Sequence, residues 1–249
     1  MIRQEQVSTY WEGEATLYSE GIAEELKSPR RQAWLELIEA HAPEGQSLRV
    51  LDVGCGPGFF SVILAAAGHQ VTGADCAANM LEEASAHASS EGVTVDFKQM
   101  DTHTLDLPDE SYDLVVCRNV TWSLPEPERA YREWMRVLRP GGRLLIFDAN
   151  WNWPLWHEET QRQHQQALAE YRARGWGEPP HHADREETDR LGLLLPLTRQ
   201  HRPAWDEQVL SELGFVQIAS ELDLGERVLD ERRQLLSRCT PMFLIRAER

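Results

Sequence analysis

A glycine-rich loop directly after a short apolar run is the part of the sequence with the clearest chemical meaning. Residues 50–58 read Val-Leu-Asp-Val-Gly-Cys-Gly-Pro-Gly, so an acidic residue, Asp52, precedes the glycines Gly54, Gly56 and Gly58. Glycine permits positive φ angles and lets a ligand approach the backbone without meeting a Cβ atom. A helix that begins after such a loop presents unpaired N–H groups. The pattern predicts a binding loop for a small organic cofactor.

An acidic residue at the end of the next predicted strand indicates a cofactor that contains a ribose. Asp75 follows Asp52 at a spacing close to the ~20 residues at which Rossmann-type sites place the carboxylate for ribose hydroxyls. A dinucleotide such as NAD is the first alternative. However, Phe59 replaces the third glycine of its G-x-G-x-x-G pattern, and Asp52 would repel a pyrophosphate. S-adenosylmethionine (SAM) has no pyrophosphate and carries an amino-acid head that Asp52 can attract, so these residues favour SAM.

A second polar segment, residues 118–125, follows the fourth predicted strand and reads Arg-Asn-Val-Thr-Trp-Ser-Leu-Pro. The carboxyl ends of parallel strands meet at one edge of a sheet, so this segment is expected beside the glycine loop. Arg118 is a candidate contact for the donor carboxylate, with a surface ion pair as the alternative. Asn119, Thr121 and Trp122 are candidates for the acceptor side, with Trp122 as a packing residue under a lid as the alternative. His157 is the histidine expected to act as general base.

Alternating apolar runs and helical patterns must position these residues. This alternation predicts βαβ units and a mostly parallel sheet in one α/β fold. The expected strands are 48–53, 70–74, 94–99, 114–117 and 143–147, followed by two late strands at 215–220 and 242–246. The expected helices are 22–40, 59–67, 80–89, 127–138 and 203–213.

The alternation of strand and helix patterns is interrupted between residues 149 and 202. This segment contains four of the chain's nine tryptophans, and Trp205 follows shortly after it. Connections inside α/β units are usually far shorter, so a functional lid or a small subdomain is expected here. The predicted organisation is N-terminal helices and cofactor-binding core at 1–148, a helical lid or substrate insertion at 149–202, and the end of the same core at 203–249. The tryptophans favour an apolar or planar acceptor; alternatively they hold the insertion to the sheet.

The order of the motifs between Tyr10 and Asp148 resembles class I SAM-dependent methyltransferases, in the ubiquinone/menaquinone-biosynthesis-like branch that acts on small molecules. The segments that carry the resemblance are Tyr10-Trp11 with Ala15 and Tyr18, Val50–Gly58, Asp75, Met100-Asp101-Thr102 with residues 107–113, and Arg136–Gly142. The resemblance implies a doubly wound, mostly parallel sheet of seven strands in the order 3-2-1-4-5-7-6, with the last strand antiparallel. It implies SAM as the cofactor.

The same resemblance implies roles for individual residues. The glycines of the loop line the methionine and ribose portion, Asp52 lies near the amino group, and Asp75 holds the ribose hydroxyls. Asp101 accepts from the adenine amine. The full set of expected cofactor-binding residues is Tyr18, Asp52, Gly54, Gly56, Gly58, Asp75, Cys76, Met80, Asp101, Thr102 and Arg118.

Composition restricts the partners. The formal net charge of −16 disfavours a nucleic-acid substrate, because phosphate recognition depends on Lys and Arg. No apolar run approaches the roughly 20 residues that a membrane span needs, and no secretory signal is evident, so a cytoplasmic protein is expected. His157 and His164 lie too far apart along a helix to chelate a metal, and His181-His182 are expected as exposed loop residues, so no metal is predicted. A homodimer is left open.

Together these observations predict an enzyme that transfers a methyl group from SAM to a small, apolar or aromatic molecule by direct displacement. The alternatives are a nucleic-acid or protein methyltransferase, a SAM-binding regulator without activity, and a NAD-type oxidoreductase. The sequence leaves the methylated atom open.

Overall fold

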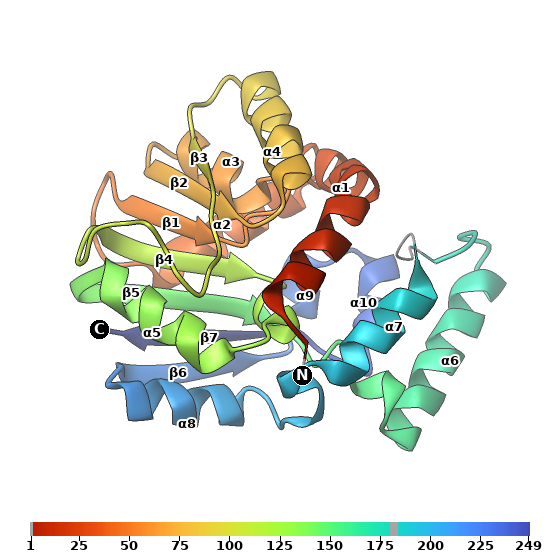
Figure 1. Cartoon of the computed structure of the whole chain (residues 1–249). Coiled ribbons are helices and arrows are strands. Elements are labelled where there is room, and N and C mark those ends of the chain that lie inside the picture. Colours follow the sequence, from red (N-terminus) through yellow and green to blue (C-terminus); the bar gives the residue numbers. More distant parts are fainter. Residues whose placement is uncertain (1, 180–183) are drawn as a thin grey trace.

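The computed structural model describes residues 2–179 and 184–249. Their strands form one sheet of seven, in the order β3-β2-β1-β4-β5-β7-β6 (Figure 1). β7 runs antiparallel to both neighbours, and the other neighbouring strands pair in parallel. The predicted fold and strand order are therefore confirmed. The strands are β1 (Arg49–Val53), β2 (Gln70–Asp75), β3 (Asp96–Gln99), β4 (Tyr112–Arg118), β5 (Leu138–Asp148), β6 (Val216–Leu222) and β7 (Phe243–Glu248).

Helices cover both faces of the sheet because the inner strands are apolar on both sides. On one face, Val50 and Leu114 pack against residues of α2 (Arg30–His41) and α3 (Phe59–Ala66). On the other face, Leu51 and Val115 pack against α5 (Pro127–Val137) and α8 (Ala204–Leu213). The remaining helices of eight or more residues are α1 (Gln4–Leu26), α4 (Ala78–Ser90), α6 (Glu158–Ala173) and α7 (Arg185–Leu194); α9 (Gly225–Val228) and α10 (Glu231–Ser237) are shorter.

The helix predicted at 22–40 is in fact the end of α1 and the whole of α2. The chain breaks at Ser28-Pro29, where the Ser28 hydroxyl donates to the Glu25 carbonyl oxygen at 2.8 Å. A proline disfavours helical geometry in the residue before it, so one continuous helix cannot pass this point. The break lets α1 leave the sheet and run beside α4.

The fifth strand begins earlier than predicted. Leu138 already pairs with Tyr112, and after an irregularity the register resumes with Arg143 opposite Leu114. Residues 140–142, expected to lead into the strand, are therefore a bulge inside it. Gly142 has no room for a side chain, because a Cβ atom there would lie 2.9 Å from the Arg139 carbonyl oxygen.

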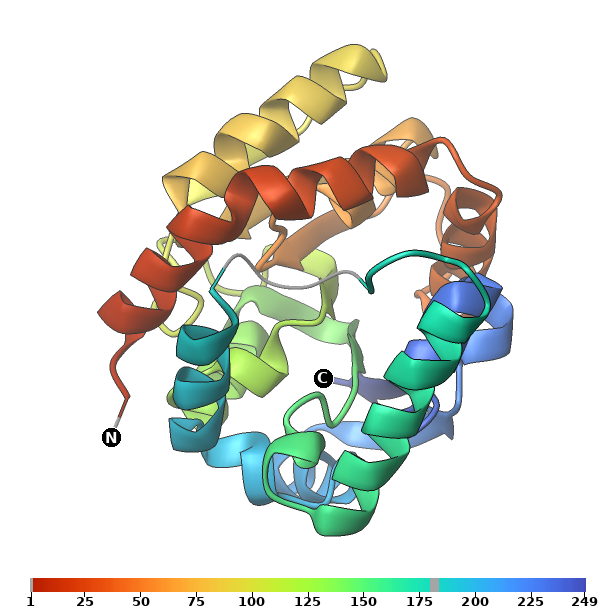
Figure 2. The same ribbon diagram turned by 90° about the vertical axis from the view of Figure 1, so that its right-hand side faces the viewer.

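The segment between β5 and α8 contains two short helical turns, η2 (Trp153–Leu155) and η3 (Pro196–Arg199), besides α6 and α7. Figure 2 looks onto the carboxyl ends of the parallel strands, where α1 passes across the sheet and α6 and α7 stand at its side. Leu191 and Leu195, at the end of α7, pack against Val7 of α1, and Ala167 of α6 packs against Leu235 of α10. His181 and His182 lie outside the described residues. Among residues 2–179 and 184–249, we find no helix with the length and apolar character of a membrane span.

Candidate active site

A cavity that is open to solvent lies at the carboxyl ends of β1, β2 and β4. Parallel α/β sheets bind their ligands at this edge. Of the residues that the sequence singles out, ten line the cavity: Tyr18, Asp52, Gly54, Gly56, Asp75, Cys76, Met80, Thr102, Arg118 and Asn119. Five do not line it: Gly58, Asp101, Thr121, Trp122 and His157.

The glycine loop joins β1 to α3. Gly54 has a φ of 62°, and a Cβ atom there would lie 2.6 Å from Cγ2 of Val120. Glycine is therefore required both by the backbone angle and by the approach of the 119–122 loop. Gly58 was expected to line the cofactor site, but it does not line the cavity. It precedes the first residue of α3, and a Cβ atom there would lie 3.0 Å from the Cβ of Ala84, so it allows α3 to pack on α4.

Asp75, at the end of β2, is buried and bonded to the backbone on both sides. Its Oδ2 accepts from the Gly56 N–H at 2.8 Å and its Oδ1 from the Ala77 N–H at 2.9 Å. Burial raises the pKa of this carboxyl. A carboxylate offers about four lone-pair positions, so two remain for a ligand. That geometry suits a pair of neighbouring hydroxyl groups.

Asp52, at the end of β1, is 2% exposed and accepts from the Ser61 hydroxyl at 2.7 Å. Burial raises the pKa of Asp52 to about 7. The side chain therefore changes its charge near neutral pH, at a position that lines the cavity. Since an anion there attracts a cationic ligand group, ligand affinity and the ionisation of Asp52 must be coupled.

We expect the affinity for S-adenosylhomocysteine (SAH) to rise roughly tenfold, ~1.4 kcal/mol, as the pH passes upward through about 7. The reason is that Asp52 then becomes an anion facing the ammonium group of the ligand. Calorimetric titration of the wild type and Asp52→Asn between pH 5.5 and 8.5 tests this. The variant should show a flat profile; an equally steep profile in the variant would assign the dependence to another group.

The same carboxyl also affects folding. Its folded-state pKa is raised, so the contribution of Asp52 to the stability of the wild type should be lost as the pH rises from about 4 through about 7. Asp52→Asn should remove that part of the pH dependence of unfolding.

Arg118, at the end of β4, lines the cavity but is paired inside the protein. Its Nη1 donates to Oε1 of Glu25 at 2.9 Å, and its guanidinium lies 4.4 Å from the centre of the Phe59 ring. Glu25 is 2% exposed and also lies 3.3 Å from Nη1 of Arg233. Burial alone would raise the pKa of Glu25, but Arg118 and Arg233 hold it below its usual value. The ion pair considered as an alternative for Arg118 exists, and it is buried rather than at the surface.

The two residues expected at the adenine differ in position. Thr102 lines the cavity, and its hydroxyl accepts from Nε1 of Trp134 at 2.8 Å. Asp101 does not line the cavity: its Oδ1 accepts from the His103 backbone N–H at 2.9 Å and lies 2.6 Å from Nδ1 of His103. One oxygen of Asp101 thus fixes this turn, and Met100 takes its place in the cavity wall.

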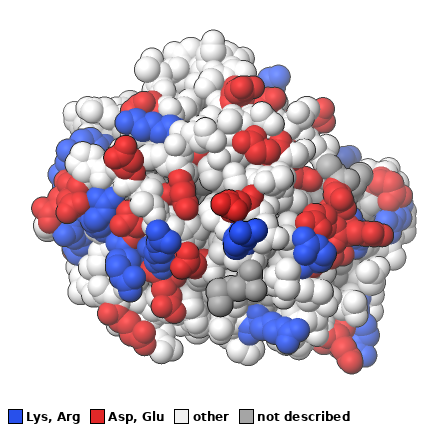
Figure 3. Space-filling model, viewed as in Figure 1, with Lys and Arg blue, Asp and Glu red and all other residues white. Residues whose placement is uncertain are grey.

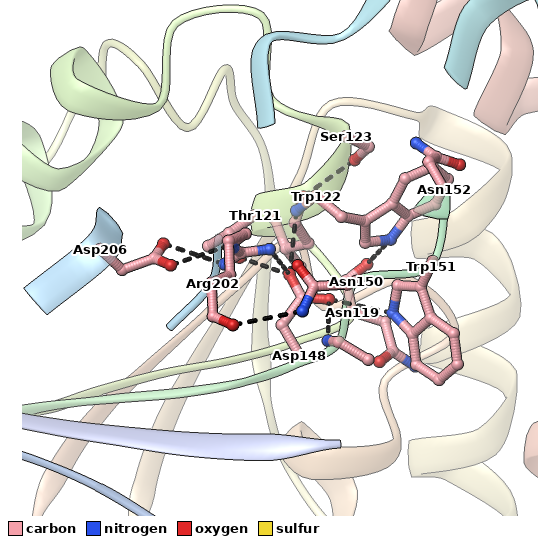
Figure 4. A network of polar contacts seen from close by, with 12 residues as sticks. Asn119, Thr121, Trp122, Ser123, Asp148, Asn150, Trp151, Asn152, Arg202 and Asp206 are labelled. Atoms are coloured by element: carbon pink, nitrogen blue, oxygen red, sulfur yellow. Dashed lines mark hydrogen bonds and ion pairs between the residues drawn. The ribbon is translucent and has the colours of Figure 1, made fainter. Parts of the chain in front are cut away.

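The loop after β4 is held by a buried cluster of charged and polar groups (Figure 4). Asp148, at the end of β5, accepts from the Thr121 hydroxyl, and its Oδ2 also accepts from the Trp122 backbone N–H at 2.9 Å. Arg202 lies 3.2 Å from the same oxygen and 2.8 Å from Oδ2 of Asp206. Asn119, two residues before Thr121, has a left-handed conformation with a φ of 59° and lines the cavity.

His157 lies away from the cavity. It precedes α6 and is exposed, and its Nδ1 accepts from the Thr160 backbone N–H at 3.3 Å. That is the geometry of a helix cap. The tryptophans of the insertion are also elsewhere: Nε1 of Trp156 donates to the Thr198 carbonyl oxygen at 2.7 Å, and none of Trp151, Trp153, Trp156, Trp176 and Trp205 lines the described cavity.

Sequence reasoning missed the contribution of α1. Besides Tyr18, the cavity wall contains Gln4, Val7, Trp11 and Ile22. These positions recur every three, four or seven residues and so share one face of a helix. The periodicity was visible in the sequence, although it does not tell a ligand-facing stripe from a core-facing one.

Comparison with known proteins agrees with this arrangement. Residues 51–146 match a family model described as a methyltransferase domain. The chain is 35% identical over 123 residues to the ubiquinone biosynthesis O-methyltransferase of Idiomarina loihiensis, covering 49% of this chain and 51% of that protein. It is 38% identical over 106 residues to the protein of the same name from Aeromonas salmonicida, covering 42% and 44%. The chain thus spans about half the length of these relatives.

Among solved structures, the chain resembles a Haemonchus contortus phosphoethanolamine N-methyltransferase in complex with phosphomonomethylethanolamine and SAH. The TM-score is 0.60 at 17% identity, over 88% of this chain and 52% of the other. At that identity the likeness bears on the fold alone. Residues 51–146 thus match a methyltransferase domain, the strand order is that implied by the resemblance to class I SAM-dependent methyltransferases, and the chain is similar over about half its length to ubiquinone biosynthesis O-methyltransferases.

Proposed function

We propose that this chain transfers the methyl group of SAM to a hydroxyl oxygen of a small aromatic molecule. One observation carries the proposal: the glycine loop, Asp52 and Asp75 share a single cavity with Asn119 of the loop after β4. A donor held by the first group would have an acceptor beside it. Methyl transfer from a sulfonium is a direct displacement, so holding the two reactants in line is the main contribution of the protein.

The donor end is defined by charge and hydrogen bonding. Asp52 attracts the ammonium of the methionine part, and the two unused lone-pair positions of Asp75 accept from the ribose hydroxyls. Met80, Met100 and Thr102 form the apolar wall for the adenine. Asp101 is a weaker candidate, because its Oδ1 is engaged by His103.

The acceptor end is neutral. Among the described residues that line the cavity, Arg118 is the one cation, and it is paired with Glu25. Lysine and arginine elsewhere alternate with acidic groups on the face in Figure 3. A strongly anionic acceptor would have little to pair with. The names of the relatives, O-methyltransferases of ubiquinone biosynthesis, support an aromatic hydroxyl as the acceptor.

Residues 149–202 serve as a lid that helps to bind the acceptor rather than the donor. The support is positional: α7 packs on the first half of α1, beside the loop that contains Trp122, while the described donor-side wall comes from β1, β2, β4 and α1. The tryptophans of this lid hold its own turns together. His157 caps α6 and has no part in the chemistry.

A cytoplasmic location follows from the same proposal. All four cysteines are free, as expected in a reducing compartment. A homodimer stays a prediction from the sequence.

The test is methyl transfer from labelled SAM to catechol and related phenols, with Asn119→Gly as the decisive variant. Glycine removes the side chain but tolerates the left-handed φ of 59°, so the loop should keep its shape. We expect at least a tenfold loss of methyl transfer with SAH affinity within about twofold, ~0.4 kcal/mol. Gln166→Gly, on the exposed surface of α6, is the control for a lost amide. Wild-type protein that binds SAH but methylates no member of the panel would point to a SAM-binding regulator.

A further inference from the structure

Arg118 lies among aromatic rings at the wall of the cavity. Its guanidinium carbon is 4.4 Å from the centre of the Phe59 ring and 5.2 Å from the centres of the Trp34 and Phe60 rings. The side chain is 11% exposed and lines the cavity. Aromatic rings at these distances attract a guanidinium through their negative faces. They also limit the water around it, so Arg118 is a cation in a partly dry environment.

One carboxylate, that of Glu25 at the end of α1, fixes the guanidinium. Its Oε1 accepts from Nη1 of Arg118 at 2.9 Å and from Nε1 of Trp34 at 3.0 Å. Burial alone would raise the pKa of Glu25, but Arg118 and Arg233 hold it below its usual value, so the group is charged. Among the described residues, Nε and Nη2 of Arg118 have no hydrogen-bond partner. Since a guanidinium presents five N–H groups, these two nitrogens remain for a second anion.

The acidic groups near Arg118 do not balance the basic ones. Arg233 of α10 also lies 3.3 Å from Glu25, and Arg30 of α2 lies 2.9 Å from Asp230. Arg30 interacts electrostatically with the other four groups, so the five form one cluster. Three guanidiniums thus face two carboxylates, and a partly buried charge without a partner is costly. The cluster can take one more anion, and Arg118 is its member that lines the described cavity.

The position of Arg118 matches one end of the proposed methyl donor. β2, β1 and β4 are neighbours in the sheet, and Asp75, Asp52 and Arg118 lie at their carboxyl ends in that order. An acid for ribose hydroxyls is thus followed by an acid for an ammonium group and then by a cation. The chemical order in SAM is the same, because the ribose lies at one end of the methionine chain and the ammonium and carboxylate share a carbon at the other. The carboxylate is therefore the anion within reach of Arg118.

We propose that Glu25 is a positioning residue for the methyl donor, holding Arg118 so that the two remaining nitrogens of the guanidinium meet the donor carboxylate. The inference rests on the proposed function above. Glu25 does not line the described cavity, so it acts through Arg118. Because Glu25 fixes one side of the guanidinium before the donor binds, less conformational freedom is lost on binding.

The test compares SAH with decarboxylated SAH, which lacks the carboxyl group and keeps the ammonium, the ribose and the adenine. Both are titrated calorimetrically, and the ratio of their affinities reports the carboxylate contact. The wild type should prefer SAH at least tenfold, and Arg118→Met should lower this preference to about twofold or less. A protein that binds neither ligand counts against the proposed function. One that binds both equally well overturns this inference alone.

Two variants of Glu25 separate its hydrogen bond from its charge. Glu25→Gln and Glu25→Leu both remove a negative charge, which by itself strengthens the attraction for an anion. Glutamine keeps an oxygen that accepts from Arg118, so Glu25→Gln should match or exceed the wild-type preference for SAH. Leucine has no acceptor, so Glu25→Leu should lower the preference at least fivefold. If the two variants show the same preference, Glu25 is only an ion-pair partner and the inference is wrong.

Arg118→Lys is the second test, and it decides the matter if Glu25→Leu does not fold. Lysine keeps the charge, but its ammonium lacks the planar fork with which arginine can bind Glu25 and the ligand together. The preference for SAH should therefore fall at least fivefold although the net charge is unchanged. A full wild-type preference in Arg118→Lys would mean that a positive charge is sufficient and that Glu25 positions nothing.

Discussion

Replacing Arg202 by methionine should lower the free energy of unfolding by about 3–5 kcal/mol. The guanidinium is 1% exposed and lies between two carboxylates, those of Asp148 and Asp206, which are 0% exposed. Without it, two carboxylates stay buried with no cation between them. For a chain of this length, the melting temperature should fall by roughly 6–20 °C.

The effect should be specific to the geometry of arginine. Arg202 uses Nε toward Asp206, Nη1 toward Asp148 and Nη2 toward the Thr121 hydroxyl. A lysine ammonium cannot span these positions, so Arg202→Lys should recover less than half of the lost stability. Arg199→Met, at an exposed site three residues earlier, is the control and should change the melting temperature little. An unchanged melting temperature in Arg202→Met would mean that water enters and solvates the two carboxylates.

Replacing Asp75 by alanine should weaken SAH binding at least about 100-fold. Two hydrogen bonds from ribose hydroxyls to a charged acceptor account for roughly 3 kcal/mol or more. The variant also leaves the Gly56 and Ala77 N–H groups without their acceptor, so the glycine loop loses a support. Asp96→Ala, with its side chain 63% exposed on β3, is the matched control for a lost carboxylate and should bind SAH normally.

A ligand change separates the two contributions to the Asp75 effect. The wild type should bind the 2′-deoxy analogue of SAH at least tenfold more weakly than SAH, whereas Asp75→Ala should bind both alike. If Asp75→Ala lowers the affinity for both ligands by the same factor, the variant still prefers SAH over the 2′-deoxy analogue. In that case Asp75 supports the loop without contacting the ribose.

The sheet and the donor end were predictable because they depend on local patterns. The apolar run Val50–Val53 predicts a buried strand. Gly54 and Gly56 predict a loop whose backbone angles other residues would adopt less easily. Parallel pairing then places Asp52, Asp75 and Arg118 at one edge of the sheet whatever the side-chain details. Strand order is harder, and it came from the resemblance in the motifs rather than from periodicity.

The acceptor side was less predictable because it depends on contacts between distant segments. Trp122 does not line the cavity, and its backbone N–H is fixed by Asp148, 26 positions later. Arg118 is paired with Glu25, a residue 93 positions earlier. His157 is next to an aromatic residue in the sequence, but in the structure it caps the start of α6. Its contact with the Thr160 backbone N–H fixes the position of the ring. None of these partners shares a local pattern with the residue it fixes.

The close approach of Val120 to Gly54 limits how this part of the molecule can change. A Cβ atom at position 54 would lie 2.6 Å from Val120. The glycine loop and the 119–122 loop therefore pack with no room for a side chain between them. Substitutions at 119–122 that move Val120 will therefore also disturb the glycine loop. No residue of α7 lines the described cavity. Evolution and directed mutagenesis can therefore vary α7 while leaving the glycine loop intact.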